Sequence, residues 1–449
     1  MQATQLFGRQ LLADTMPNVA EWQPKLLRRP AMTLTAQWAI CQRCGQRTVK
    51  QTVQLPRNNY YCPHCFQLGR VTSDQWLWSL PEPNQFAKLS ESPLSWTGQL
   101  TPAQAACSQE ISAIFAAGQT HLLWAVTGAG KTEMLFNGIE QALMKGLRVA
   151  IASPRVDVCL ELAPRLQAAF ASIPQIVLYG EMPGSYDYRQ LTICTTHQLL
   201  RFYHAFDVLV IDEVDAFPFA ADPGLAFAAE RAKKLTGALL YLTATPSKEL
   251  QRQERQQKIS VSYLPARYHG HPLPEIQLKL TNQWRRSLQK KRLPGAVKRT
   301  LNRIVTNQRR FLIFVPHVKD LAALAAALTQ NFPALKLATV HASDPERHAK
   351  VQRMRDGELD CLVTTTILER GVTFANIDVI VLGADDGVFS TAALVQIAGR
   401  AGRKATYPTG LVQFFADSQT QPIKEARRQI RFVNRKARRE GLLGGRDHD

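Results

Sequence analysis

Long apolar runs are missing from this sequence of 449 residues, and no segment approaches the length that a membrane-spanning helix needs. The first residues, MQATQLFGRQLLADTMPNVAEWQ, also lack the basic start and apolar core of a secretory signal. No repeat of solenoid period is visible. These absences predict a cytosolic globular protein without a membrane span.

Acidic residues are scarce: 36 Asp and Glu stand against 55 Lys and Arg, so the formal net charge is +19. A surplus of this size usually answers a polyanion such as nucleic acid or an anionic membrane surface, and charge alone does not choose between them. Hydrophobic residues make up 45% and charged residues 20%, which excludes global disorder. The length exceeds one hydrophobic core and predicts two large domains with a smaller module.

Cysteines are few, and half of the eight form two CxxC pairs separated by seventeen residues. In a reducing cytosol this spacing predicts a four-cysteine metal site rather than disulfides, with Gly45 permitting the turn of the first pair. Because four thiolates fill a tetrahedral shell, the predicted zinc is structural and His64 is not needed as a ligand. The predicted zinc ligands are Cys41, Cys44, Cys62 and Cys65.

Short apolar or β-branched runs alternate with helix-length amphipathic runs from about residue 120 onward. This alternation predicts an α/β fold of two tandem lobes with parallel sheets. The first strand series is HLLWAV, RVAIAS, IVLYG, LTICT, DVLVID and ALLYLTA, and the second is FLIFVP, LKLATVH, DCLVTT, DVIVLGA and GLVQFF. The predicted domains are a separate N-terminal zinc module (1–95), a first lobe (96–265), a basic linker (266–305) and a second lobe with a basic tail (306–449).

A glycine-rich loop follows the strand HLLWAV and leads into a helical stretch, which is the context of a phosphate-binding loop. Its glycines let backbone N–H groups turn toward phosphate oxygens, Lys131 would reach the β- and γ-phosphates, and Thr132 would bind Mg²⁺. Ala125 stands where the motif usually begins with glycine. The predicted ATP-binding loop is Thr127, Gly128, Ala129, Gly130, Lys131 and Thr132.

An acid cluster ends a later strand of the same predicted sheet, in DVLVIDEVDAF. There Asp212 would hold Mg²⁺ and Glu213 would polarise the attacking water. Two acids at the end of a strand can also be a solvated turn, but their pairing with the phosphate loop favours a nucleotide site.

Three further segments distinguish a motor from a nucleotide switch: TAT (243–245), TTTILERGVTF (364–374) and QIAGRAGR (396–403). In the last, Arg400 and Arg403 are three residues apart, and we expect them at the start of a helical stretch, facing the γ-phosphate across a cleft. Arginines in that position stabilise transition-state charge and couple ATP to closure of the lobes.

With this set the chain resembles the superfamily 2 helicase and translocase ATPases over roughly residues 98–420, which implies RecA-like lobes that use ATP and Mg²⁺. The tetrapeptide DEVD differs from the DEAD and DEAH forms, so the resemblance does not imply an RNA helicase. It implies an adenine-reading role for Gln104, a nucleotide contact at Gly371 and a catalytic role for Gln396. The residues implied to grip a nucleic-acid backbone are Arg155, Thr195, Thr196, Thr364 and Thr365.

A four-cysteine site ahead of such a motor is similar to the late-competence DNA-uptake ATPases of transformable Gram-positive bacteria. That resemblance implies movement of single-stranded DNA inward at the cytoplasmic face of the membrane, beside a membrane channel and a phosphoribosyltransferase-like partner. Primosomal replication-restart helicases are the alternative within the enzyme class, but their zinc cysteines follow the phosphate loop. A zinc-dependent nucleic-acid adaptor with vestigial lobes is the alternative of another class, and the intact motor residues count against it. The oligomeric state is left open, and a homo-oligomer is one alternative.

Three features have more than one interpretation. The basic stretch 284–310 and the tail KEARRQIRFVNRKARRE can contact DNA, a partner or a membrane, or can simply be solvated faces. Trp76 and Trp78 can stack on bases or pack against the zinc module.

Overall fold

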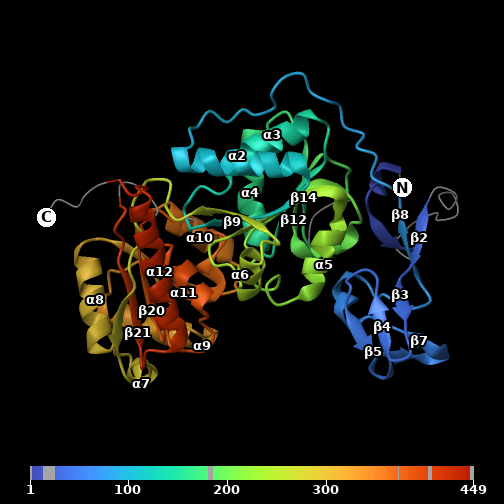
Figure 1. Ribbon diagram of the computed structural model, residues 1–449. Helices are drawn as coiled ribbons and strands as arrows, with labels where there is room; N and C mark the ends of the chain where they lie inside the picture. Colours follow the sequence, from blue (N-terminus) through green and yellow to red (C-terminus); the bar gives the residue numbers. More distant parts are fainter. Residues whose placement is uncertain (1–2, 14–25, 181–185, 373, 403–406, 445–449) are drawn as a thin grey trace. The chain divides into compact units, whose positions relative to one another are not determined.

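The computed structural model describes residues 3–13, 26–180, 186–372, 374–402 and 407–444. It divides into two compact units, each built around a parallel sheet, which confirms the predicted α/β fold of two RecA-like lobes (Figure 1). The first unit comprises Met1–Trp124 and Lys131–Leu264, and the second comprises Ala125–Gly130 and Pro265–Asp449. The short segment Ala125–Gly130 therefore groups with the second unit although its flanks belong to the first.

The sheet of the first unit has seven strands in the order β11-β12-β10-β13-β14-β9-β15, and the pairs from β11 to β9 are parallel. Every residue of β10 and β12 is buried, as expected for strands covered on both faces. All six predicted strands of the first series are present. The strands are β9 (Thr120–Ala125), β10 (Val149–Ser153), β11 (Gln175–Leu178), β12 (Leu191–Thr195), β13 (Phe206–Ile211), β14 (Lys233–Thr243) and β15 (Ser260–Leu264).

Helices cover this sheet, and α2 and α3 lie side by side in Figure 1. The first of them begins with a capping box: Gln104 N donates to Thr101 Oγ1, and Thr101 N donates to Gln104 Oε1 at 2.8 Å. It ends at Gly118, which takes a left-handed conformation with φ 64°. The helices are α2 (Pro102–Ala117), α3 (Phe136–Met144), α4 (Val156–Ala169), α5 (Pro223–Ala232) and α6 (Lys248–Arg255).

The N-terminal segment forms three small sheets, two of three strands and one of two. Trp78 is buried with Leu6, Leu11 and Leu26, whereas Trp76 is 39% exposed with the Arg28 guanidinium over its ring. The strands are β1 (Gln10–Leu12), β2 (Leu27–Pro30), β3 (Met32–Leu34), β4 (Trp38–Cys41), β5 (Arg47–Val49), β6 (Gln54–Leu55), β7 (Asn59–Tyr60) and β8 (Trp76–Ser79).

This segment is not a separate module as predicted, because it shares a hydrophobic core with the first lobe. The link is also ionic. Arg148, just before β10, pairs with Glu82 at 2.6 Å, and both side chains are fully buried. The same guanidinium donates to the carbonyl of Phe7 at 3.3 Å and to the hydroxyl of Tyr186 at 2.5 Å. One buried cation thus binds groups from three parts of the chain.

The second sheet has six parallel strands in the order β16-β21-β20-β17-β19-β18. All five predicted strands of the second series are present. The strands are β16 (Gln277–Leu280), β17 (Arg310–Phe314), β18 (Leu337–Val340), β19 (Cys361–Thr364), β20 (Ile377–Leu382) and β21 (Val412–Ala416). The helices are α7 (Trp284–Gln289), α8 (Gly295–Thr306), α9 (Val318–Asn331), α10 (Arg347–Arg355), α11 (Thr391–Ala398) and α12 (Gln421–Arg439).

The prediction of a basic linker over 266–305 is wrong. This stretch contributes β16 to the second sheet, and α7 and α8 pack on the same core through Trp284, Leu288 and Leu301, which are at most 3% exposed. Five of its cations lie on these two amphipathic helices, whose apolar residues recur at helical spacing: Arg285 and Arg286 on α7, and Lys298, Arg299 and Arg303 on α8.

Among the described helices, none is both long enough and apolar enough to cross a membrane.

We predict that Glu82→Gln lowers the free energy of unfolding of the first unit by about 3–5 kcal/mol, because it leaves the Arg148 guanidinium buried without a counter-charge. Urea unfolding followed by tryptophan fluorescence measures the effect. The control is Glu249→Gln, which removes an exposed ion pair with Arg252 on α6 and should leave the urea midpoint unchanged. Equal midpoints for the two variants would contradict the prediction.

Candidate active site and metal centre

Parallel pairing brings the predicted motifs of the first lobe to one edge of its sheet. Neighbouring parallel strands end at the same edge, so the segments that follow β9, β14, β13, β10 and β12 all leave the sheet there. The register agrees, since Trp124 pairs with Thr243, and Ile211 pairs with Tyr241 and Ala152. The segments at this edge are the phosphate loop, TAT, DEVD, ASPR and TTHQ.

The phosphate loop has the backbone that its glycines predict. Gly128 has φ 82° and Gly130 has φ 74°, both in the left-handed region that favours glycine. Thr132 is buried, a short 3₁₀ turn (Glu133–Leu135) follows it, and α3 then begins at Phe136. The loop therefore presents backbone N–H groups in a turn that a side chain at either glycine would strain.

Asp212 and Glu213 follow β13 directly. The backbone N–H of Glu213 donates to Asp212 Oδ1 at 2.9 Å, and Glu213 has φ 56°, an uncommon conformation for a residue with a side chain. Such a conformation costs on the order of 1–3 kcal/mol and is concentrated at functional sites. The structure thus brings the predicted metal ligand and the predicted water-polarising residue together at the edge of the sheet.

Asp215 is a functional candidate that the sequence analysis did not assign. Its Oδ1 accepts from Thr243 Oγ1 at 2.7 Å, and its Oδ2 accepts from Thr245 Oγ1. The last acid of DEVD is therefore tied to both threonines of TAT. The signal was present in the sequence as two hydroxyls spaced two residues apart at the end of a neighbouring strand.

Gln104 is buried at the third position of α2, and the capping box uses its Oε1. Its predicted adenine-reading role stays a prediction.

The residues predicted to grip a nucleic-acid backbone differ in exposure. Thr196 and Thr364 are fully buried, and Thr364 Oγ1 donates to the carbonyl of Val340 at 3.1 Å. Thr195 is also buried, whereas Arg155, the residue before α4, and Thr365 are partly exposed. In this structure the buried side chains do not reach the surface, and the role of Arg155 and Thr365 stays a prediction.

QIAGRAGR lies at the end of a helix, not at the start as predicted. The apolar run TAALVQIA forms α11, which ends at Ala398 where Gly399 follows. Arg400 is 1% exposed, and its Nε donates to the carbonyl of Glu369 at 3.1 Å. Arg403 lies outside the described residues.

Gln396 on α11 bonds to the phosphate loop within the second compact unit. The hydroxyl of Thr127 donates to Gln396 Oε1 at 2.9 Å, and both side chains are buried. Gly371, the other predicted nucleotide contact, has φ 70° in the turn after the ILER segment. The structure therefore brings two of the predicted site residues into direct contact.

Arg267 is a second residue that sequence reasoning missed. It is 2% exposed, and its Nη1 donates to the carbonyls of Ala401, at 2.9 Å, and Gly402, while Nη2 donates to the carbonyl of Gly399 at 3.2 Å. His269 Nε2 lies 3.2 Å from the Gly402 carbonyl. Burial and the neighbouring guanidinium of Arg267 lower the pKa of His269 to about 4, so this imidazole is neutral near pH 7. These two side chains hold the glycine-rich end of α11.

Arg267 also lies against the phosphate loop. Its Cγ would be 3.7 Å from a Cβ built on Gly128, and the N–H of the next residue, Tyr268, donates to the Gly128 carbonyl at 3.2 Å. One segment therefore contacts both the phosphate loop and the glycines that precede and follow Arg400.

The four paired cysteines converge as predicted. All four are at most 2% exposed, and their sulfurs lie within 4.8 Å of one another. The Sγ distances are 3.8 Å for Cys41–Cys65 and 3.6 Å for Cys44–Cys62. Sulfurs about 2.3 Å from a tetrahedral ion lie about 3.8 Å apart, so the cluster fits a four-thiolate metal centre.

Two neighbouring residues shape this centre. Arg43 is buried, and its Nε donates to Cys65 Sγ at 3.3 Å. Hydrogen bonds with the other three thiols, together with this guanidinium, hold the pKa of Cys65 below its ordinary value. Gly45 has φ 70°, and a Cβ there would lie 2.5 Å from the Phe227 ring on α5. Glycine is thus required both for the turn and for packing on the first lobe.

The fold and the site define a helicase-type, nucleic-acid-dependent ATPase. Two family models match: DEAD/DEAH box helicase over residues 101–253 and helicase conserved C-terminal domain over residues 296–405. A solved structure described as DEAD-box helicase Mss116 bound to ssRNA and UDP-BeF superposes with a TM-score of 0.55 at 18% identity, covering 70% of this chain and 69% of that one.

Proteins with similar sequences identify the family within this class of ATPases. The competence protein ComFA of Bacillus subtilis is 44% identical over 88% of this chain and 85% of its own length. That of Streptococcus pneumoniae is 40% identical over 96% of this chain and 97% of its own length. The chain belongs to the ComFA family of competence proteins. The replication restart protein PriA of Synechocystis is 23% identical over 68% of this chain and 48% of its own length, which disfavours the restart alternative.

We predict that Arg267→Lys lowers kcat for ATP hydrolysis roughly tenfold to hundredfold with little change in the KM for ATP. Lysine keeps the charge but cannot hold three carbonyls in a fork, and a charge-assisted hydrogen bond contributes about 1.5–3 kcal/mol. Steady-state kinetics and the thermal midpoint are measured together, with Arg255→Lys on the exposed face of α6 as the control. A variant with unchanged kcat, or one whose loss only tracks unfolding, would refute this positioning role.

Proposed function

We propose that this protein is an ATP-driven motor on single-stranded DNA that moves DNA into the cytoplasm during natural transformation. The observation that carries the proposal is the phosphate loop, with both glycines in the left-handed region, at the same sheet edge as Asp212 and Glu213. Membership of the competence family supports the choice of DNA as the track. The basic balance of the chain suits a polyanionic substrate.

The residues fit hydrolysis of a nucleoside triphosphate. Lys131 and the loop N–H groups bind the phosphates, and Thr132 and Asp212 hold Mg²⁺, which neutralises phosphate charge. Glu213 orients and polarises the attacking water. Arg400 and Arg403 stabilise charge on the γ-phosphate, and Gln396 positions the loop through Thr127. Gln104 and Gly371 complete the nucleotide contacts.

The four-cysteine centre holds one structural zinc. Its sulfur spacing and its burial support zinc, which prefers four thiolates in a closed tetrahedral site. Because the cysteines share a core with the first lobe, the metal stabilises the fold of the N-terminal segment and of that lobe and takes no part in catalysis.

The partners in this proposal are single-stranded DNA, a membrane DNA-uptake channel and a phosphoribosyltransferase-like protein. The motor then works peripherally at the inner face of the cell membrane, as a monomer or a homo-oligomer. A zinc-dependent adaptor with vestigial ATPase lobes is the rival, and the retained site residues argue against it.

We predict that single-stranded DNA stimulates ATP hydrolysis and that Lys131→Ala abolishes turnover, because the loop loses the cation that binds the β- and γ-phosphates. Hydrolysis is measured with single-stranded DNA, duplex DNA, RNA and no nucleic acid. Lys145→Ala, a lysine directly after α3, is the control and should behave as the wild type. Stimulation by RNA alone, or DNA binding without hydrolysis in the wild type, would refute the motor.

We also predict about one zinc per chain, lost in Cys44→Ser together with a fall in the thermal midpoint, since structural zinc contributes directly to folding. Metal analysis of purified protein and a chelator titration of the midpoint test this. Cys107→Ser on α2 is the control and should retain the metal. Folded wild-type protein recovered from cells without metal would contradict the assignment.

A further inference from the structure

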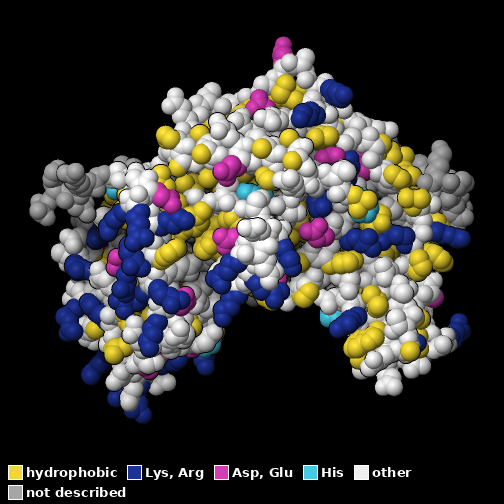
Figure 2. Space-filling view, in the orientation of Figure 1, with side chains coloured by type: hydrophobic (Ala, Val, Ile, Leu, Met, Phe, Trp, Pro, Cys, Tyr) yellow, Lys and Arg dark blue, Asp and Glu magenta, His cyan; other side chains and the backbone are white. Residues whose placement is uncertain are grey.

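The helix α12 has two chemically different faces. Eight of its nineteen residues are Lys or Arg and one is Glu. The inner face is apolar and buried, formed by Ile423, Ala426, Ile430, Val433 and Ala437. The outer face carries five exposed cations that we call the basic stripe: Lys424, Arg428, Arg431, Arg435 and Arg438. Figure 2 shows Lys and Arg gathered over this helix.

The stripe is a straight line of charge. Its members are spaced by four, three, four and three residues, so they fall within roughly an 80° arc of a helix with 3.6 residues per turn. The line extends about 21 Å along the axis at 1.5 Å per residue. This length matches about six nucleotides at the 3.4 Å rise of one strand. A row of this kind suits a linear polyanion better than one small anion.

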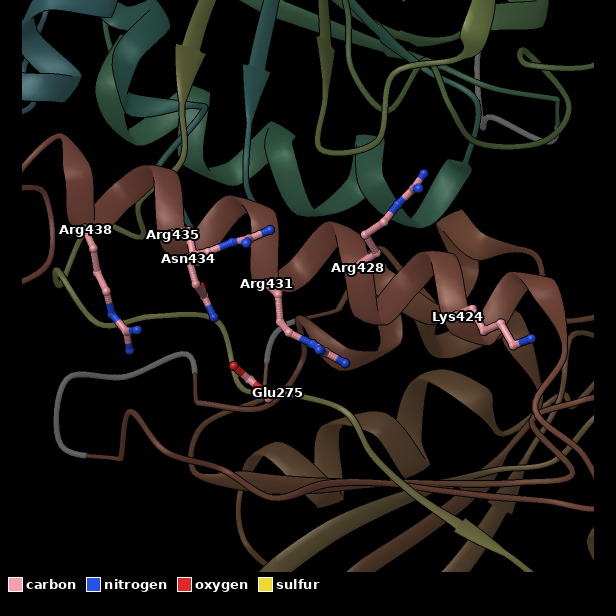
Figure 3. A pocket seen from close by; sticks show the side chains of 7 residues that line it. All are labelled: Glu275, Lys424, Arg428, Arg431, Asn434, Arg435 and Arg438. Atoms are coloured by element: carbon pink, nitrogen blue, oxygen red, sulfur yellow. The ribbon is translucent and has the colours of Figure 1, made fainter.

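The stripe lines a groove of about 370 Å³ with Asn434 and Glu275 (Figure 3). Asn434 fixes the opposite wall, because its Oδ1 accepts from Leu273 N at 2.9 Å and its Nδ2 donates to Leu273 O at 2.8 Å. Glu275 is the single carboxylate in the lining, so the groove is strongly positive.

Most of these cations have no ionic partner in the part of the chain that the structure describes. Arg428 pairs with Glu425 at 2.7 Å, and 73% of the arginine side chain is exposed. Within the described residues, no ion pair is made by Lys424, Arg431, Arg435 or Arg438. Counting Glu425 and Glu275 against the five cations leaves three uncompensated positive charges along the groove.

We propose that the basic stripe binds the phosphate backbone of the single strand on which the proposed motor acts, as a track separate from the motor motifs. Four of the five cations are arginines, whose planar forks suit phosphate oxygens. The helix α12 packs on α11, which carries Gln396 and is followed by Arg400. A strand bound to the stripe therefore contacts α12, and α12 in turn packs on α11, the helix that carries Gln396. This inference rests on the proposed function only for the identity of the strand.

The same features disfavour a membrane surface. A helix that binds a bilayer inserts its apolar face, but the apolar face of α12 is in the core. Of the large apolar side chains on α12, Phe432 is the exposed one, at 48%. Contact with anionic lipid would therefore be through head groups alone.

The test compares two five-fold variants with equal loss of charge. The stripe variant combines Lys424→Gln, Arg428→Gln, Arg431→Gln, Arg435→Gln and Arg438→Gln. The matched control combines Lys290→Gln, Lys291→Gln, Arg292→Gln, Lys298→Gln and Arg299→Gln, all exposed in the stretch from the end of α7 through α8. Binding of labelled oligo(dT) without nucleotide is measured by anisotropy between 50 and 200 mM salt, the range used for such slopes.

In the stripe variant, the slope of log K against log salt should be less steep by about 3.5, since each phosphate contact on a single strand contributes about 0.7. Across this salt range the wild type should then lose roughly 100-fold more affinity than the stripe variant. The control should keep the wild-type slope. Equal slopes for wild type and stripe variant, or equal losses in both variants, would overturn the proposal.

Three further measurements test the interpretation. A double variant, Arg431→Gln with Arg438→Gln, is measured if the five-fold variant unfolds. Its slope should be less steep than that of the wild type by about 1.4. Vesicles of phosphatidylserine in phosphatidylcholine replace DNA in a second arm, and stripe-dependent binding there with an unchanged DNA slope would assign the stripe to membranes and overturn the proposal. Lys131→Ala should bind DNA with the wild-type slope, so failure of the stripe and failure of the ATPase are read separately.

Discussion

Parallel strand pairing is the constraint on which this site depends. A parallel sheet sends every strand out at the same edge, so five segments far apart in the chain meet without needing contacts with one another beforehand. β10 and β12 are buried throughout, and β13 is buried except at Asp207, which fixes the register and hence the position of each segment. Side chains then refine this edge, as Asp215 does when it joins the acid cluster to Thr243 and Thr245.

Strand pairing does not fix the glycine-rich segments of the site, and these segments also have few side chains that could hold them in place. The turn that follows α11, residues 399–402, is held instead through its backbone carbonyls, whose oxygens accept charge-assisted hydrogen bonds from a cation. Arg267 supplies that cation and donates to three carbonyls while it is almost completely buried. The arrangement gives a segment of Gly and Ala a defined shape, and it places the shape of that segment under the control of a residue next to the phosphate loop.

The sequence predicts most of this structure because apolar periodicity and motif order are local signals. The eleven predicted strands of the two lobes, the phosphate loop, the acid pair and the convergence of the four cysteines follow from local patterns and spacing, whereas β15, β16 and the strands of the N-terminal segment were not predicted. Arg267 could not be found in this way, because its partners are backbone carbonyls, which leave no trace in residue types. The packing of Gly45 on Phe227 and the Arg148–Glu82 pair are likewise contacts between distant segments, so the N-terminal part reads as separate until the fold is known. The prediction of a linker was wrong for another reason, because the ten cations of this stretch obscured its apolar residues at helical spacing.

The distribution of charge carries one further physical consequence. The nineteen residues of α12 include eight cations and one acid, a surplus of seven positive charges. The net charge of the whole sequence is +19. Like charges three or four residues apart destabilise a helix by about 0.2–0.5 kcal/mol per pair, and the stripe contains four such pairs. Burial of Ile423, Ile430 and Val433 offsets this easily, since each buried side chain of this size contributes about 1.5–3 kcal/mol. Burial of the inner face therefore outweighs the repulsion along the outer face, and a bound polyanion would relieve that repulsion.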